Sequence, residues 1–165
     1  MKTPIMKYVL IAIAAIVFPA LIFFCIRGYS NAINSLPPKI IVSNKIEAIQ
    51  KTHGRRYVEV LGTGSMFPYI ARAQAGEDPT KTIVAIAVFD SKKTYKDIRV
   101  GDLVNYRMPQ QTKFNSILHQ AVEKDSAGWI MSGIGNSYSE NLLRVTSDNF
   151  IGVTEQVYVW PPYDK

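Results

Sequence analysis

The sequence predicts a mostly β domain that follows one N-terminal transmembrane helix. The stretch from Tyr8 to Ile26 has 19 residues and no charge, and a helix needs about 20 apolar residues to cross the hydrocarbon core of a bilayer. After this stretch, short runs of β-branched and aromatic residues alternate with turn-forming Gly, Asp, Asn and Pro. Many short strands separated by turn signals are typical of an all-β or mostly β domain.

The apolar stretch is expected to be a retained anchor over residues 1–27. A signal peptide cleaved at Ser30–Ala32 is the alternative, but the apolar core of such peptides usually has about 7–15 residues. Close to the stretch, Lys2, Lys7 and the amino terminus lie on one side and Arg27, Lys39 and Lys45 on the other, so the positive-inside rule leaves its orientation open. A linker over residues 28–42, which contains a Pro-Pro pair, then leads to a domain over residues 43–165.

The domain is expected to begin with a short helix and to continue as strands. Asn44 followed by Glu47 three residues later resembles a capping box, and the helix would end near Gly54. Asp102, in a Gly-Asp turn between strands, is expected to bond to nearby backbone N–H groups. The expected strands are Tyr57–Leu61, Ile83–Phe89, Leu103–Arg107, Ile117–Val122, Trp129–Met131 and Phe150–Trp160.

Composition excludes several classes of function. The net charge is +6 and the basic residues are scattered, which suits weak attraction to an anionic lipid surface or an ordinary solvated surface, but not a nucleic-acid-binding stripe. Cys25 is the only cysteine and lies in the apolar stretch, so no cysteine-based metal site can form. Since no phosphate-binding loop is present either, neither a metal nor an organic cofactor is expected.

Ser65 is the strongest candidate for a reactive side chain. It lies in the segment from Gly62 to Pro68, where glycines allow a sharp turn and the proline stiffens its far side. A serine hydroxyl is a weak nucleophile until a neighbouring base accepts its proton. The sequence offers two histidines. His53 belongs to a basic helix end, whereas His119 interrupts an apolar strand.

Five segments, in order, resemble boxes of the type I signal peptidases. The Ser-Met-x-Pro nucleophile box of that family resembles Thr63 to Pro68, and its Gly-Asp-hydrophobic-Val box resembles Val100 to Arg107. The family's base, which is followed by hydrophobic residues, falls at His119 to Val122. Its Gly-Asp-Asn-Asn box is similar to Gly133 to Glu140, and its closing Ile-Gly-x-Val strand is similar to Phe150 to Thr154.

The resemblance implies a fold and a set of roles. It implies a signal-peptidase-like β domain in which Ser65 attacks the scissile carbonyl and His119 is the general base, as in the archaeal and endoplasmic-reticulum members. The backbone N–H of Ser65 and the hydroxyl of Thr63 would form the oxyanion hole. Apart from the resemblance, Met66 and Phe67 belong to an apolar cluster beside the serine, which could be core, line small apolar substrate pockets or touch lipid.

One departure from the family pattern concerns the group that orients the base. Ile134 stands where the family's Gly-Asp-Asn-Asn box has aspartate. Ser139 or Glu140, at the end of the same segment, could orient His119 instead, or a serine–histidine dyad could suffice.

The resemblance implies a single-pass membrane serine endopeptidase that removes leader peptides from exported preproteins, with its catalytic domain on the extracytoplasmic side. Its partners would be the preprotein and the lipid bilayer, and no nucleic acid; the sequence predicts no oligomeric state. Two alternatives stay open: a peptidase specialised for pilin or conjugation-system proteins, and a non-catalytic anchored scaffold. An autoprotease of the phage-repressor type is disfavoured, because that group uses a lysine base.

Overall fold

The computed structural model describes residues 36–108, 116–136 and 140–164. Residues Leu36–Lys165 belong to one compact unit. The expected anchor over residues 1–27 lies outside the described residues. Within the described residues, no helix has both the length and the apolar character needed to cross a membrane.

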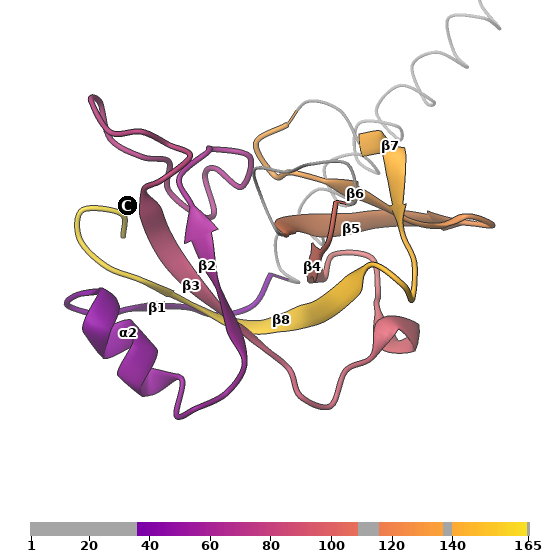
Figure 1. The fold of residues 1–165 in the computed structure, drawn as a ribbon, viewed down its shortest axis with the longest axis horizontal. Helices are drawn as coiled ribbons and strands as arrows, with labels where there is room; N and C mark the ends of the chain where they lie inside the picture. Colours follow the sequence, from indigo (N-terminus) through magenta and orange to yellow (C-terminus); the bar gives the residue numbers. More distant parts are fainter. Residues whose placement is uncertain (1–35, 109–115, 137–139, 165) are drawn as a thin grey trace, which may run out of the picture. The chain divides into compact units, whose positions relative to one another are not determined.

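The compact unit is built on one curled sheet, antiparallel except for one pair (Figure 1). The strand order is β2-β3-β8-β4-β5-β6-β7, and β1 pairs in parallel with β8. The prediction of a mostly β domain is confirmed. The elements are β1 (Lys39–Ile41), α2 (Lys45–Lys51), β2 (Tyr57–Leu61), β3 (Ile83–Phe89), the 3-10 helix η1 (Tyr95–Asp97), β4 (Leu103–Tyr106), β5 (Ile117–Asp125), β6 (Gly128–Ser132), β7 (Glu140–Val145) and β8 (Phe150–Val159).

Strand β8 joins the two halves of the sheet (Figure 1). Its first residues pair with β4, where Val153 lies opposite Val104, and its later residues pair with β3, where Val157 lies opposite Ala87. The register shifts in β3 before Phe89 and in β4 before Tyr106. Irregularities of this kind bend a strand and increase its twist, which suits a sheet that curls around β8.

Two hydrophobic clusters lie on the two halves of the sheet. The first cluster contains buried residues of β3, β8, α2 and the turn that carries Ser65, which we call the serine turn. They include Val84, Ile86, Val157, Ala48 and Met66. The second collects residues of β4 to β8, including Val104, Tyr106, Met131, Val145 and Val153.

All six expected strands overlap observed ones, but β1 and β7 were not expected. β1 lies within residues 28–42, which were expected to be a linker, and it belongs to the compact unit that begins at Leu36. The residues on either side of β1 also bond to β8: Val157 N–H donates to the Pro38 carbonyl and Val42 N–H donates to the Val159 carbonyl. A three-residue strand is too short to show periodicity, so only its distant partner identifies it.

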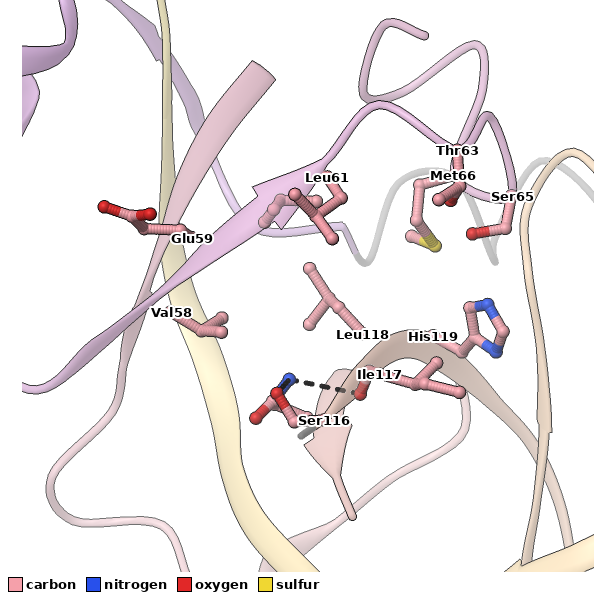
Figure 2. A pocket seen from close by; sticks show the side chains of 12 residues that line it. Val58, Glu59, Leu61, Thr63, Ser65, Met66, Ser116, Ile117, Leu118 and His119 are labelled. Carbon is pink, nitrogen blue, oxygen red and sulfur yellow. Dashed lines mark hydrogen bonds between the residues drawn. The ribbon is translucent and has the colours of Figure 1, made fainter. Parts of the chain in front are cut away.

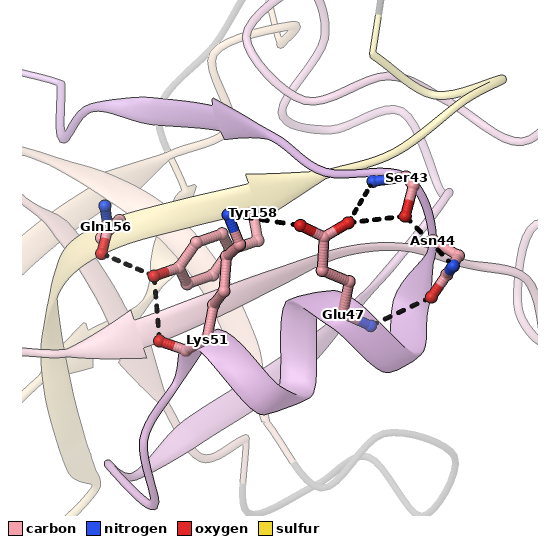
Figure 3. Close-up of polar contacts among 6 residues, drawn as sticks. All are labelled: Ser43, Asn44, Glu47, Lys51, Gln156 and Tyr158. Carbon is pink, nitrogen blue, oxygen red and sulfur yellow. Dashed lines mark hydrogen bonds and ion pairs between the residues drawn. The ribbon is translucent and has the colours of Figure 1, made fainter.

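Helix α2 begins at the expected cap residue, Asn44, but the return bond from Glu47 goes to a different residue than in a capping box (Figure 3). Asn44 Oδ1 accepts from the Glu47 N–H at 3.0 Å, as the prediction requires. The Glu47 carboxylate, however, accepts from the backbone N–H and the hydroxyl of Ser43, one residue before the cap. At the other end, the Tyr158 hydroxyl of β8 donates to the Lys51 carbonyl at 3.1 Å, which holds the helix against the sheet.

Candidate active site

A pocket of about 260 Å³ lies between β2, the serine turn and the start of β5 (Figure 2). Along the part of the chain that the structure describes, β2 is an end strand of the sheet. β6 pairs with β5 only from Gln120 onward. Ile117 and Leu118 therefore belong to the first part of β5, which does not pair with β6. The lining residues are Val58, Glu59, Val60, Leu61, Thr63, Ser65, Met66, Asn105, Ser116, Ile117, Leu118 and His119.

The structure brings Ser65 and His119 to the same pocket although they are far apart in the sequence. Ser65 is half-buried on the turn after β2, and His119 lies in β5 with 4% of its surface exposed. Figure 2 shows the imidazole ring below the serine turn, on the same side of the pocket as the Ser65 hydroxyl. The two side chains that the sequence analysis proposed as nucleophile and base therefore line the same pocket.

The turn that carries Ser65 depends on a glycine before it. Gly64 has φ +88°, a left-handed conformation that residues with a Cβ seldom adopt. The turn continues with two backbone bonds, from Phe67 N–H to the Gly64 carbonyl and from Ile70 N–H to the Met66 carbonyl. The first of these bonds spans Ser65 and closes the turn around it.

The segment that resembles the Gly-Asp-Asn-Asn box supports this turn through its backbone. Gly135 N–H donates to the Ser65 carbonyl at 2.9 Å. A Cβ on Gly135 would lie 2.8 Å from the Gly64 carbonyl oxygen and 2.9 Å from that of Phe67. Only glycine permits this approach. The side chain of Ile134 packs against the first hydrophobic cluster, so this segment positions the serine peptide with its backbone.

A residue that the sequence analysis missed contacts His119. Nδ1 of His119 lies 3.2 Å from the hydroxyl oxygen of Tyr106, which is 1% exposed. Tyr106 comes from β4, whose Val104 lies directly opposite His119 in the β4–β5 register. If Nδ1 carries the proton and donates a hydrogen bond to the Tyr106 oxygen, the other ring nitrogen, Nε2, keeps a lone pair that can accept a proton.

Of the residues expected to form the oxyanion hole or to bind substrate, some line the pocket and one does not. Thr63 and Met66 line the pocket together with Ser65. Met66 is also 4% exposed and belongs to the first hydrophobic cluster, so both readings of this residue apply. Phe67 is absent from the lining residues; it is 39% exposed, and the guanidinium of Arg72 lies 4.5 Å from its ring centre.

The two residues expected to orient the base are not placed by the structure. Ser139 lies outside the described residues. Glu140 begins β7, with its backbone opposite Met131 of β6, but its side chain is not among those described. Their roles therefore stay predictions.

Two other ionisable groups are placed outside the pocket. Asp102 accepts from the Arg99 N–H at 2.9 Å and from the Lys93 ammonium at 3.1 Å, which confirms the expected structural role in the turn. His53 is exposed at the end of α2 with φ 51°. Among the described residues, no group of three or more His, Cys, Asp or Glu side chains could hold a metal ion.

Asn105 and Ser116 also line the pocket and were missed by the sequence analysis. Asn105 is a polar residue inside a strand whose four residues are all buried. The criterion that singled out His119, a polar side chain that interrupts an apolar strand, would have found Asn105 as well. Tyr106 gave no such signal, because an aromatic residue is ordinary in a strand.

No family model matches the chain, and neither a curated protein nor a solved structure matches it.

Proposed function

We propose that this protein is a membrane-anchored serine endopeptidase that removes leader peptides from exported preproteins. The observation that supports this most is the shared pocket of Ser65 and His119, with Thr63 beside them. The order of sequence segments that resemble type I signal peptidases supports it independently. No other described histidine lines the pocket, since His53 lies at the end of α2.

The proposed reaction has two halves. His119 accepts the proton of the Ser65 hydroxyl while the serine oxygen attacks the scissile carbonyl, and the protonated imidazole then gives that proton to the leaving amine. A water molecule hydrolyses the resulting acyl-enzyme, again with His119 as base. The Ser65 N–H and the Thr63 hydroxyl donate to the oxyanion. Loss of one such donor typically lowers the rate about 100- to 1000-fold.

The pocket supports recognition of an extended substrate. β2 is an end strand among the described elements and lines the pocket with Val58–Leu61. A peptide that adds to such an edge forms main-chain hydrogen bonds and directs alternate side chains into pockets. The preference for small side chains is what the resemblance to type I signal peptidases implies. The substrate would therefore be a leader segment with small residues at alternate positions before the cut.

The anchor and the topology complete the proposal. Residues 1–27 would hold the enzyme in the membrane as a single-pass protein, with the catalytic domain on the extracytoplasmic side where leader peptides emerge. The substrates are either general exported preproteins or specialised pilin or conjugation-system proteins.

Cleavage of a test preprotein by the full chain in detergent tests this function. Ser65→Ala and His119→Ala should each abolish cleavage. Ser147→Ala and His53→Ala are matched controls, because both residues are exposed and outside the pocket, and both variants should cleave like the wild type. Turnover above background in Ser65→Ala would eliminate the serine mechanism. Binding of the preprotein without cleavage by any variant would favour the non-catalytic scaffold.

A further inference from the structure

A second pocket, apart from the one that Ser65 lines, has a mainly cationic lining. Its volume is about 290 Å³, and the described residues that line it are different from those of the first pocket. Arg55 and Arg56 come from the chain just before β2, and Lys93 comes from the loop after β3. Asp90 is the single carboxylate among the described lining residues. This lining therefore carries three positive charges and one negative charge.

The sheet brings together two basic pairs that are distant in the sequence. Arg55-Arg56 and Lys92-Lys93 are the only places where two basic residues are adjacent. Because β2 and β3 are antiparallel, the residues before β2 lie beside those after β3, and the Phe89 N–H donates to the Arg56 carbonyl at 3.0 Å. Cations that look scattered along the chain thus meet at one pocket.

The three cations differ in how far their charges are already paired. Arg55 donates to the Glu155 carboxylate at 3.0 Å, and the Lys93 ammonium lies 3.1 Å from the Asp102 carboxylate. Arg56 forms no ion pair with a carboxylate among the described residues. A guanidinium carries five N–H donors and stays charged at all ordinary pH values. Arg56 is therefore the cation that can give most to a ligand.

An aromatic wall positions the Arg56 guanidinium. It lies 5.5 Å from the ring centre of Phe89, which is a cation–π distance. Phe89 itself is 6% exposed and packs against Gly152, where a Cβ would lie 2.9 Å from the ring. Only glycine allows the ring this close to β8. The cation–π contact leaves the N–H groups of Arg56 to donate to oxygen atoms.

We propose that this pocket binds a phosphate group, carried by a lipid headgroup or present as free phosphate. The inference does not rest on the proposed peptidase function. The phosphate oxygens accept from the Arg56 guanidinium, whose fork of donors matches them, and from the Lys93 ammonium and the Ser91 hydroxyl, which line the same pocket. Donors from two separate segments suit a tetrahedral anion, whose oxygens point in several directions. Asp90 opposes the anion and limits its affinity.

Calorimetry with inorganic phosphate tests the site, with the full chain in a neutral detergent at constant ionic strength. The wild type should bind phosphate. Arg56→Gln should bind it about 10-fold more weakly, the low end of the range for hydrogen bonds to a charged group. Asp90→Asn should bind it more tightly, because the amide oxygen can still accept from the Lys92 N–H at 2.8 Å while the negative charge is gone. Lys81→Gln is the control, since Lys81 is exposed and outside the pocket, and it should bind like the wild type.

A second titration identifies the source of the phosphate group. Short-chain phosphatidic acid, whose headgroup is a phosphate monoester, is added to the micelles, with short-chain phosphatidylcholine as the reference. Tighter binding of phosphatidic acid than of inorganic phosphate assigns a lipid headgroup, and the opposite order assigns free phosphate. No binding of either ligand, or wild-type affinity in Arg56→Gln, overturns the proposal. An affinity of Asp90→Asn no higher than that of the wild type overturns it as well.

Discussion

The hydroxyl oxygen of Tyr106 lies 3.2 Å from Nδ1 of His119 at a buried position beside the pocket. In the proposed mechanism this contact holds the imidazole in the tautomer that can accept the Ser65 proton, and the tyrosine oxygen stabilises the imidazolium that follows. Tyr106 does not line the pocket, so it is a positioning residue that acts through His119.

Tyr106→Phe removes the hydroxyl and keeps the ring. Since one neutral hydrogen bond contributes about 0.5–1.5 kcal/mol, we expect kcat to fall about 2- to 12-fold while KM stays near the wild-type value. Steady-state kinetics measures both constants. Tyr95→Phe is the control, because Tyr95 contacts Phe150 away from the pocket. A Tyr106→Phe enzyme with unchanged kcat would show that the contact has no role in the reaction.

The pH dependence of cleavage tests the identity of the base. A histidine must be neutral to accept the serine proton, because the imidazolium has no lone pair free to accept it. We therefore expect kcat/KM to fall when the pH is lowered and to level off at higher pH. A kcat/KM that does not fall on acidification would require another base.

Gly135→Ala tests the support of the serine turn. The added Cβ would lie 2.8 Å from the Gly64 carbonyl oxygen, so the two segments must separate, at a cost of about 1–3 kcal/mol for an overpacked site. We expect a lower midpoint of thermal unfolding and a large loss of kcat. Gly54→Ala is the control: Gly54 has φ +74° and open space around it, so its replacement should lower stability but leave kcat unchanged. Equal kcat in both variants contradicts the account.

Glu47 gives a prediction about stability in acid. Hydrogen bonds from Ser43, and then the ammonium of Lys51, lower the pKa of Glu47 from 4.5 to about 2 (Figure 3). Because the folded state depresses this pKa, the contribution is complete above about pH 4.5 and is lost as the pH falls toward about 2. Glu47→Gln should therefore unfold at a lower temperature than the wild type at pH 7, and the difference should shrink through this window. A constant difference from pH 7 to 2 would assign the effect to something other than the carboxylate charge.

The sequence was sufficient for features that depend on local patterns. Runs of β-branched residues predicted most strands, and Asn44 predicted the start of α2. The glycines on both sides of Thr63 predicted a turn at Ser65, and His119 was noticed because a polar residue interrupts an apolar strand. These signals are local because side-chain periodicity and turn chemistry act over a few residues.

The features that the sequence did not predict depend on partners distant in the chain. β1 is recognisable only by its parallel pairing with β8. The contact of Tyr106 with His119 follows from the β4–β5 register, and the contact of Gly135 with Ser65 joins two loops. A single sequence contains no distances, so such contacts could not be derived from it.

Labelling of the full chain in detergent with a serine-directed acylating probe, read by peptide mass spectrometry, tests the central claim most directly. An activated nucleophile reacts with such a probe where ordinary serines do not. The account predicts an adduct on Ser65 in the wild type, none in Ser65→Ala and much slower labelling in His119→Ala. An adduct on a different serine, or equal labelling of wild type and His119→Ala, would contradict a serine nucleophile activated by His119.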